Sequence, residues 1–300
     1  MAKTGFPLPP GRGMPRLRHV LAPNPSPLTF TGTNTYLLGS GRVALIDPGP
    51  DDPAHMARIL DSLDPGETVS HIFVTHPHRD HSALAPALSA ATGAPTLGFG
   101  TATEGRSPRM AALAETGMTS SGDGLDHGFR PDLRLADGDR TFGDDWEITT
   151  LHTPGHLGSH ICLSVGEWLF SGDHVMGWSS SVVSPPDGDM SAYLSSLLRL
   201  DHPDWSHFLP GHGDPVAQPR ERVQALYRHR VARGDQILAA LSQGPASCDG
   251  LRQRIYPDIP PSLRRAAHQT ILAHLIDLLE QNRISSREED ITTARFSLAR

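Results

Sequence analysis

The sequence predicts an α/β sandwich followed by a small helical domain. The first two thirds alternate short β-prone apolar runs with stretches of helical periodicity, whereas from about Pro219 the pattern becomes helical. Several strand-like runs end in turns that carry histidine or aspartate. Because residues on loops held by a rigid scaffold often carry function, we expect a functional site along one edge of the sandwich.

The elements of the first part follow from apolar, β-branched runs and from helical spacing. Strands are expected at 35–38, 43–46, 71–74, 94–98, 147–151, 161–165, 168–170 and 207–209. Helices are expected at 53–63, 82–92, 109–116 and 190–201. In the last of these, Tyr193, Leu197 and Leu200 recur at helical spacing. The irregular stretches 117–131 and 174–189 are expected to be loops.

The C-terminal part has a different order. Helices are expected at 220–241, 248–256 and 262–282, and the tail 284–298 could form a hairpin. The helix 262–282 is amphipathic, so its apolar face must pack against the first part or against a second subunit. We therefore predict two domains, 1–218 and 219–300, and a homodimer is one assembly that this helix would allow.

One short segment carries four side chains that can ligate a metal ion. His76, His78, Asp80 and His81 fall within six positions, directly after the apolar run 72–74. Imidazole and carboxylate suit zinc or a similar divalent ion. If the chain leaves a strand here, His76 and His78 point the same way, and the turn brings Asp80 and His81 to a second position. This spacing can supply two adjacent ions.

Three later turns each carry one further candidate ligand. His156 ends Thr-Pro-Gly-His, Asp173 ends Ser-Gly-Asp and His212 ends Pro-Gly-His, each after an apolar run. Glycine and proline allow the tight turns and close backbone approach that a site at strand ends needs. The seven candidates are therefore expected to gather at one place.

The order His-x-His-x-Asp-His, followed by the three later ligands, resembles the metallo-β-lactamase superfamily of hydrolases. The segments 31–38 and 44–49 resemble that family's opening strands, and the likeness runs from about residue 30 to residue 215. Within the superfamily the β-lactamase-like protein 2 family is most similar, because Arg79 and Ser82 fit its motif and because it carries a C-terminal winged-helix-like domain. Ala83 and Leu84 stand where the superfamily usually has glycine, which affects local packing.

The resemblance implies an αββα metallo-β-lactamase sandwich with a small C-terminal helical, winged-helix-like domain. It also implies one ion held by His76, His78 and His156, a second held by Asp80, His81 and His212, and Asp173 as the bridge. The donor chemistry agrees, because a carboxylate can offer one oxygen to each ion whereas an imidazole presents one nitrogen. The implied chemistry is hydrolysis by a hydroxide between two divalent ions, with zinc as the expected metal and Asp80 and Asp173 as catalytic carboxylates.

Residues beside the ligands are candidates for contacting the substrate. His174, Trp178 and Ser179 lie in the irregular stretch that follows Asp173. Loops beside a rigid site commonly select the substrate. The plainer alternative is an ordered surface loop, and Trp178 fits either description.

Composition bounds the cellular setting. Hydrophobic residues make up 37% and charged residues 20% of the chain, which is ordinary for a globular enzyme. The two cysteines give no disulfide framework, and no apolar run has the length of a signal peptide or of a membrane span. We therefore predict a cytoplasmic protein without a membrane partner.

Several functions fit these observations. The ions could act on a small-molecule acyl ester or thioester, or on the phosphodiester bonds of single-stranded RNA. A net charge of −7 with a single lysine argues against RNA, because phosphate binding depends on lysine and arginine. Residues 219–300 carry 13 arginines against 9 acidic residues, so a ligand-sensing regulator that binds nucleic acid is an alternative of another class. The sequence favours the ester or thioester hydrolase, with a C-terminal domain that is structural or covers the site.

Overall fold

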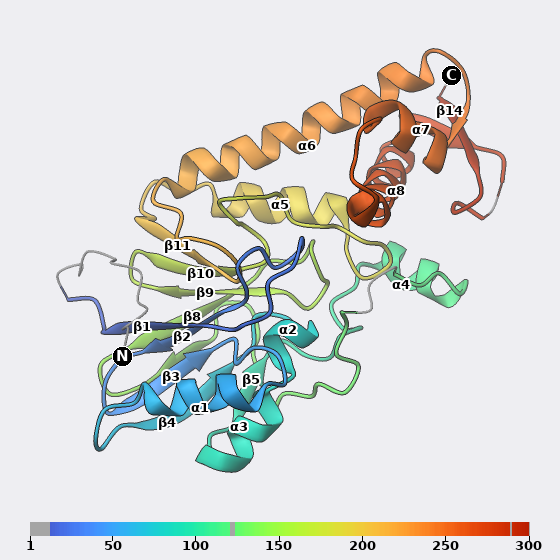
Figure 1. Cartoon of the computed structure of the whole chain (residues 1–300). Coiled ribbons are helices and arrows are strands. Elements are labelled where there is room, and N and C mark those ends of the chain that lie inside the picture. The colour runs from blue at the N-terminus through green and yellow to red at the C-terminus, as the bar shows by residue number, and fades with distance from the viewer. Residues whose placement is uncertain (1–12, 121–123, 289, 300) are drawn as a thin grey trace.

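Two β-sheets lie face to face between layers of helices in the computed structural model, which describes residues 13–120, 124–288 and 290–299 (Figure 1). The predicted domain 1–218 and the predicted loop 117–131 therefore lie partly outside the described residues. The first sheet runs in the order β1 (Leu17–Leu21), β2 (Asn34–Leu38), β3 (Arg42–Ile46), β4 (Thr68–Phe73), β5 (Thr96–Gly98) and β6 (Leu133–Arg134). The pairs from β1 to β3 are antiparallel and those from β3 to β6 are parallel.

The second sheet completes the sandwich. It runs in the order β11 (His207–Pro210), β10 (Trp168–Gly172), β9 (Ile161–Val165), β8 (Glu147–His152) and β7 (Arg140–Phe142). Strands β10 and β11 are parallel, because α5 (Met190–Leu200) connects them across the outer face, and the other pairs are antiparallel.

Side chains that alternate along the strands fill the space between the sheets. Tyr36, Ile46 and Phe73 of the first sheet belong to one buried cluster with Leu163 and Phe170 of the second. The opposite face of the first sheet packs against α1 (Pro53–Asp61) and α3 (Ala85–Thr92) through a separate cluster. The outer face of the second sheet packs against α5. This arrangement confirms the predicted αββα sandwich.

The C-terminal part is a winged-helix domain, as predicted. It contains α6 (Pro219–Leu241), β12 (Ala246–Ser247), α7 (Cys248–Ile255), a 3₁₀ turn (Pro261–Leu263), α8 (Arg264–Glu280), β13 (Ile284–Ser286) and β14 (Arg295–Leu298). The small sheet β12-β14-β13 includes the predicted hairpin. Among the described helices, none combines the length and apolarity needed to cross a membrane.

Helix α6 belongs to two hydrophobic cores. The helix runs past α5 towards α7 and α8 (Figure 1). Val223 and Leu226, in its first half, pack in the cluster that covers the second sheet and α5, whereas Ile237 and Leu241 belong to the winged-helix core. The same winged-helix core takes in the apolar face of α4 (Pro108–Glu115) from the first part of the chain. The boundary between residues 218 and 219 stays a prediction.

The structure also differs from the expected elements. The helix predicted at 82–92 is divided into α2 (Arg79–Ser82) and α3, because the amide of Leu84 donates to the carbonyl of Gly49, 3.1 Å away. Pro86, which has no amide hydrogen, then lies in the first turn of α3. Strands β1, β6, β7 and β12 were not expected; the last three are two or three residues long.

Candidate metal centre

The segment 76–81 divides its four candidate metal ligands between two groups. His76 and His78 lie between the end of β4 and the start of α2, and their Nε2 and Nδ1 atoms are 2.9 Å apart. Asp80 and His81 lie within α2, where Asp80 Oδ2 is 3.6 Å from His81 Nε2. The two pairs belong to different groups of possible metal ligands.

The first group contains His76, His78, His156 and Asp173, whose donor atoms lie within 4.8 Å of one another. His156 comes from the turn after β8, and its Nε2 is 3.0 Å from Nδ1 of His78. Asp173 follows β10 directly, and its Oδ2 is 3.7 Å from His156 Nε2 and 4.0 Å from His76 Nε2. Three imidazoles and one carboxylate oxygen therefore converge.

The second group contains Asp80, His81 and His212. His212 Nε2 lies 3.2 Å from Asp80 Oδ2 and 3.3 Å from His81 Nε2. The other oxygen of Asp173, Oδ1, is 3.5 Å from His81 Nε2 and 3.4 Å from His212 Nε2. The two oxygens of Asp173 thus face different groups, and the structure brings all seven predicted residues together.

A glycine lets the chains approach this closely. A Cβ atom at Gly211 would lie 2.5 Å from Cε1 of His81 and 2.6 Å from Oδ1 of Asp173. Any side chain there would push into both residues. The Pro-Gly-His turn after β11 therefore provides room for its neighbours as well as the imidazole of His212.

The ring nitrogens that face away from the centre are held by fixed partners. His76 Nδ1 lies 3.1 Å from Thr75 Oγ1, His81 Nδ1 lies 2.9 Å from Asp47 Oδ2, His156 Nδ1 lies 2.6 Å from the carbonyl of Val182 and His212 Nδ1 lies 3.1 Å from the carbonyl of Gly32. Metal-ligating histidines characteristically have such partners, which fix the tautomer and orient the ring.

Asp47 is a supporting residue that sequence reasoning missed. It is buried with a positive φ of 51°, its Oδ1 accepts a hydrogen bond from the amide of Thr75 at 2.8 Å, and its Oδ2 accepts one from the Thr75 hydroxyl at 2.9 Å. Asp47 therefore holds the start of the ligand segment as well as the ring of His81. The signal was the Asp-Pro-Gly turn directly after an apolar strand.

Charge is divided within the centre. Burial alone would raise the pKa of Asp80 and Asp173, but His81 and His212 outweigh it and hold both pKa values below the usual range. Burial would lower the pKa of His81, but Asp80 and Asp173 raise it to about 9; the same carboxylates hold the pKa of His212 well above its ordinary value. The second group therefore takes up protons when no cation balances its carboxylates.

The histidines of the first group, in contrast, favour the neutral form. Burial is the main cause that lowers the pKa of His76, His78 and His156, and for His78 the value is about 3. These rings are neutral at physiological pH, as metal ligands must be.

The donor set fits two divalent cations. Asp173 Oδ1 is buried without a hydrogen-bond partner, although a carboxylate oxygen in that position normally has one. Ring nitrogens from separate turns face one another, and their outer nitrogens are already held. Nitrogen and oxygen donors of this kind suit zinc and similar ions.

The predicted substrate contacts lie at different depths. His174 is completely buried, and its carbonyl accepts a hydrogen bond from the hydroxyl of Tyr193 at 3.1 Å. Trp178 and Ser179 are partly exposed, and Trp178 packs beside Gly213, where a Cβ atom would lie 2.6 Å from Cδ1 of the indole. The loop is therefore accessible to solvent at residues 177–180, and Ser181 and Val183 beyond them are buried again.

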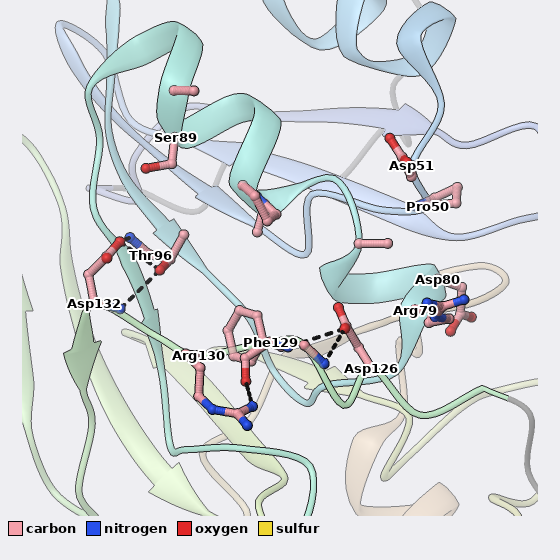
Figure 2. Close-up of a pocket in the computed structure, with 15 residues that line it drawn as sticks. Pro50, Asp51, Arg79, Asp80, Ser89, Thr96, Asp126, Phe129, Arg130 and Asp132 are labelled. Carbon is pink, nitrogen blue, oxygen red and sulfur yellow. Dashed lines mark hydrogen bonds between the residues drawn. The ribbon is translucent and has the colours of Figure 1, made fainter.

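An open groove of about 920 Å³ reaches the centre at Asp80. Figure 2 shows Arg79 and Asp80 at one end of the groove and Thr96 with Asp132 at the other. Asp132 accepts hydrogen bonds from the amide and hydroxyl of Thr96, both at 2.8 Å, so it is already satisfied. Asp80 is the charged group that joins this groove to the centre.

Comparison with known proteins agrees with the fold and the site. A family model described as the metallo-β-lactamase superfamily matches residues 28–212, and one described as the β-lactamase-associated winged helix domain matches residues 247–293. The β-lactamase-like protein 2 homolog of Drosophila melanogaster is 30% identical over 275 residues, covering 88% of each chain. An atrochrysone carboxyl ACP thioesterase of Paecilomyces divaricatus is 28% identical over 233 residues, covering 76% of this chain and 65% of that protein.

Solved structures show the same architecture. A metallo-β-lactamase family protein from Thermus thermophilus superposes with a TM-score of 0.74 at 26% identity, covering 94% of this chain and 98% of that one. A β-lactamase domain protein from Burkholderia ambifaria gives a TM-score of 0.78 at 24% identity, covering 97% of this chain and 93% of that one, and shows the fold.

The αββα sandwich and the seven converging histidine and aspartate side chains together define a metal-dependent hydrolase. The chain belongs to the metallo-β-lactamase superfamily, and its winged helix and 30% identity place it with the β-lactamase-like protein 2 homologues.

Proposed function

We propose that this chain is a dinuclear hydrolase of acyl esters, and of thioesters in particular. The observation that carries the proposal is the placement of Asp173, whose Oδ2 faces His76 and His156 while its Oδ1 faces His81 and His212. We assign His76, His78 and His156 to one ion and Asp80, His81 and His212 to the other, with Asp173 shared. Zinc as the metal, a homodimeric assembly and a cytoplasmic location stay predictions.

The reaction breaks one bond and forms another. Two divalent ions, when bound, supply a water molecule of lowered pKa and polarise the carbonyl that it attacks. Oxygen from water forms a bond to the acyl carbon, the C–S bond breaks, and a proton reaches the departing thiolate. Asp80 and Asp173 have lowered pKa values, so both are carboxylates that can accept a hydrogen bond from the attacking water and orient it.

Two observations favour an acyl substrate over RNA. The relative named as an acyl carrier protein thioesterase aligns over 76% of this chain. The net charge of −7 disfavours a long polyanion, which is held mainly by lysine and arginine. A small ester or thioester needs no such surface.

We retain Trp178 and Ser179 as proposed substrate contacts. Both lie in the loop that follows Asp173, and both are partly exposed. Trp178 offers an aromatic face, whereas Ser179 offers a hydroxyl that lies 3.4 Å from the carbonyl of Ser180. His174 is buried, so its role as a substrate contact stays a prediction from sequence.

Metal stoichiometry and thiol release together test the proposal. We expect about two equivalents of metal in protein purified without chelator, and release of free thiol from acetyl and octanoyl thioesters of N-acetylcysteamine. His156→Ala and His212→Ala should each reduce the metal content towards one equivalent per chain, because each variant removes a ligand from a different group.

A matched control is available in His202→Ala. His202 is an exposed histidine that pairs with Asp204 outside the centre, so its replacement should leave two equivalents in place. Less than half an equivalent in zinc-supplemented wild-type protein would contradict the dinuclear site. Cleavage of a single-stranded RNA without any thiol release would replace the thioester assignment with the nuclease.

A further inference from the structure

Three exposed or partly exposed apolar side chains lie in the two loops that contact the His212 turn. Leu28 and Phe30, in the loop between β1 and β2, are 56% and 47% exposed, although both are large and apolar. The Phe30 ring stacks on Trp178, with ring centroids 5.0 Å apart and an angle of 17° between the planes. Leu28, Phe30 and Trp178 are called the apolar platform here.

The loop holds Phe30 in a conformation that costs free energy. Phe30 has a positive φ of 55°, which is uncommon for a bulky residue without a special local role. Hydrogen bonds within the loop impose this geometry: the amide of Gly32 donates to the carbonyl of Thr29 at 2.9 Å, and Asn24 Oδ1 accepts from the amide of Thr33 at 2.9 Å. An ordered loop therefore presents an aromatic ring at the surface instead of burying it.

The apolar platform is attached to the metal centre from both of its parts. On the Phe30 side, the carbonyl of Gly32 lies 3.1 Å from His212 Nδ1. On the other side, Trp178 lies against Gly213, the residue that follows His212, and belongs to the loop that begins at Asp173. The apolar platform therefore adjoins the outer side of the His212 turn, next to the metal centre.

We propose that the apolar platform is the binding site for the acyl chain of the substrate, and that it makes this enzyme selective for acyl groups of medium length over acetyl. The inference rests on the proposed thioester hydrolysis and names the substrate class within it. Exposed apolar surface of this kind favours ligands that remove it from water, and stacked rings accept an aliphatic chain across their faces.

A nucleobase could also stack on the aromatic rings of the apolar platform. The side chains around the platform favour an acyl chain instead. Leu28, two residues before Phe30 in the same loop, is an exposed aliphatic side chain. The guanidinium of Arg222, which lies near this loop, is directed inward: its Nε donates to the carbonyl of Met176 at 2.7 Å and its Nη2 to the carbonyl of Ser179 at 2.6 Å. Both hydrogen bonds of this guanidinium are made to the protein, so it does not point towards a bound phosphate. Neutralisation of phosphates dominates the binding of single-stranded nucleic acids.

Chain-length selectivity tests the inference directly. For thioesters from butanoyl to octanoyl, we expect kcat/KM to rise by about twofold per methylene, roughly 16-fold in total, since partial burial gives less than the roughly fourfold expected for a fully buried methylene. Phe30→Asn should reduce the total to less than about fourfold, because it removes the ring with a residue that tolerates positive φ. Leu28→Ser, at a position without positive φ, should also flatten the series.

Phe142→Ala is the matched control. Phe142 is 57% exposed on β7, at the far edge of the second sheet, so its loss should leave the chain-length series unchanged. An unchanged series in both Phe30→Asn and Leu28→Ser would overturn the inference, as would equal flattening in Phe142→Ala.

A binding measurement separates this inference from the proposed reaction. Octanoate should change the tryptophan fluorescence of wild-type protein, and Trp178→Phe should lose that change while Trp146, Trp168 and Trp205 remain. This readout needs no turnover, so binding of octanoate without cleavage of any thioester would support the apolar platform and contradict only the proposed reaction. A response to a short single-stranded RNA and none to octanoate would overturn the acyl-chain site.

Discussion

Asp173 is the residue on which the two ligand groups depend. Its replacement by asparagine keeps the shape of the side chain but removes the charge, and an amide offers one oxygen where the carboxylate offers two. We expect Asp173→Asn to lose at least about 100-fold in kcat and to bind less metal, while the fold is retained. Thiol release and elemental analysis measure both effects.

The control for this variant is Asp204→Asn. The side chain of Asp204 is 83% exposed and pairs with His202 at the surface. Near-normal turnover in Asp173→Asn would show that the bridging assignment is wrong, and equal losses in both variants would point to a general effect of removing a carboxylate.

His81 gives the metal-free protein a distinct dependence on pH. Its pKa is raised to about 9, above the roughly 6.5 of an unfolded histidine, because Asp80 and Asp173 favour the protonated ring once burial is overcome. This stabilisation is fully present below about pH 6.5 and is lost as the pH rises towards 9. Metal binding has the opposite dependence, because the ion must displace the proton.

We expect the Tm of the metal-free protein and the Tm of the Zn²⁺-loaded protein to diverge as the pH rises. After chelation, the Tm should fall between about pH 6.5 and pH 9, and over the same window the increase in Tm on adding Zn²⁺ should grow. Differential scanning fluorimetry at half-unit intervals of pH measures both. A Zn²⁺-induced shift that shrinks towards pH 9 would contradict the ligand role of His81.

At the scale of elements, helix α6 fixes the loop that follows Asp173. Arg222 donates to the carbonyls of Met176 and Ser179, and the buried Arg230 donates to the carbonyl of Ser181. The next carbonyl, that of Val182, lies 2.6 Å from Nδ1 of His156. The helix therefore orders the loop on one side while a proposed ligand uses the loop on the other.

We expect Arg222→Met to raise KM for octanoyl thioester by about tenfold, with little change in metal content. The variant loses two hydrogen bonds to the loop, worth on the order of 1 kcal/mol each, but no ligand. The control is Arg228→Met, which changes an exposed arginine on the same helix. Equal KM values in the two variants would show that the loop does not contribute to substrate binding.

Sequence patterns predicted the central strands and the edge strand β11, but missed the edge strands β1, β6, β7 and β12. The apolar runs of β2, β3, β9 and β10 are recognisable because these strands are largely buried. Strand β7, whose residues 140–142 are mostly exposed, exists through its pairing with β8, which no local pattern reports. The break between α2 and α3 was detectable, because Pro86 cannot continue the hydrogen-bond ladder of a preceding helix.

The same contrast holds for the centre. The seven residues that converge were predicted because histidine and aspartate at the ends of apolar runs are visible in the sequence. The carbonyls of Gly32 and Val182, which hold the rings of His212 and His156, were not, because every residue has a carbonyl and its direction depends on tertiary structure. The exposure of Phe30 was equally invisible from its residue type.

At the scale of the whole molecule, the C-terminal part supplies none of the seven converging residues but covers the second sheet. Val223 and Leu226 of α6 belong to the hydrophobic cluster that contains Leu169 and Phe208. A protein shortened to end at Gln218 would expose that cluster and would lose the contacts of Arg222 and Arg230 with the loop.

We expect such a shortened protein to be less soluble, and to lose affinity for substrate more than metal content. Size-exclusion chromatography, elemental analysis and KM for octanoyl thioester measure the three properties. A monodisperse product with unchanged kinetics would show that the C-terminal part is an independent module, and would revive the prediction that it binds nucleic acid.

The sharing of helices between cores also affects how the chain is made. Met110 and Leu113 of α4 pack in the same core as Phe296, which leaves the ribosome roughly 180 residues later, about 10 to 40 s at ordinary rates of synthesis. Until α6 to α8 have been synthesised, the apolar face of α4 lacks these core partners, and the second sheet lacks its cover until α6 follows. Chaperones that bind exposed apolar segments therefore have a long time in which to act, and the yield of active enzyme should depend on them more than its final stability suggests.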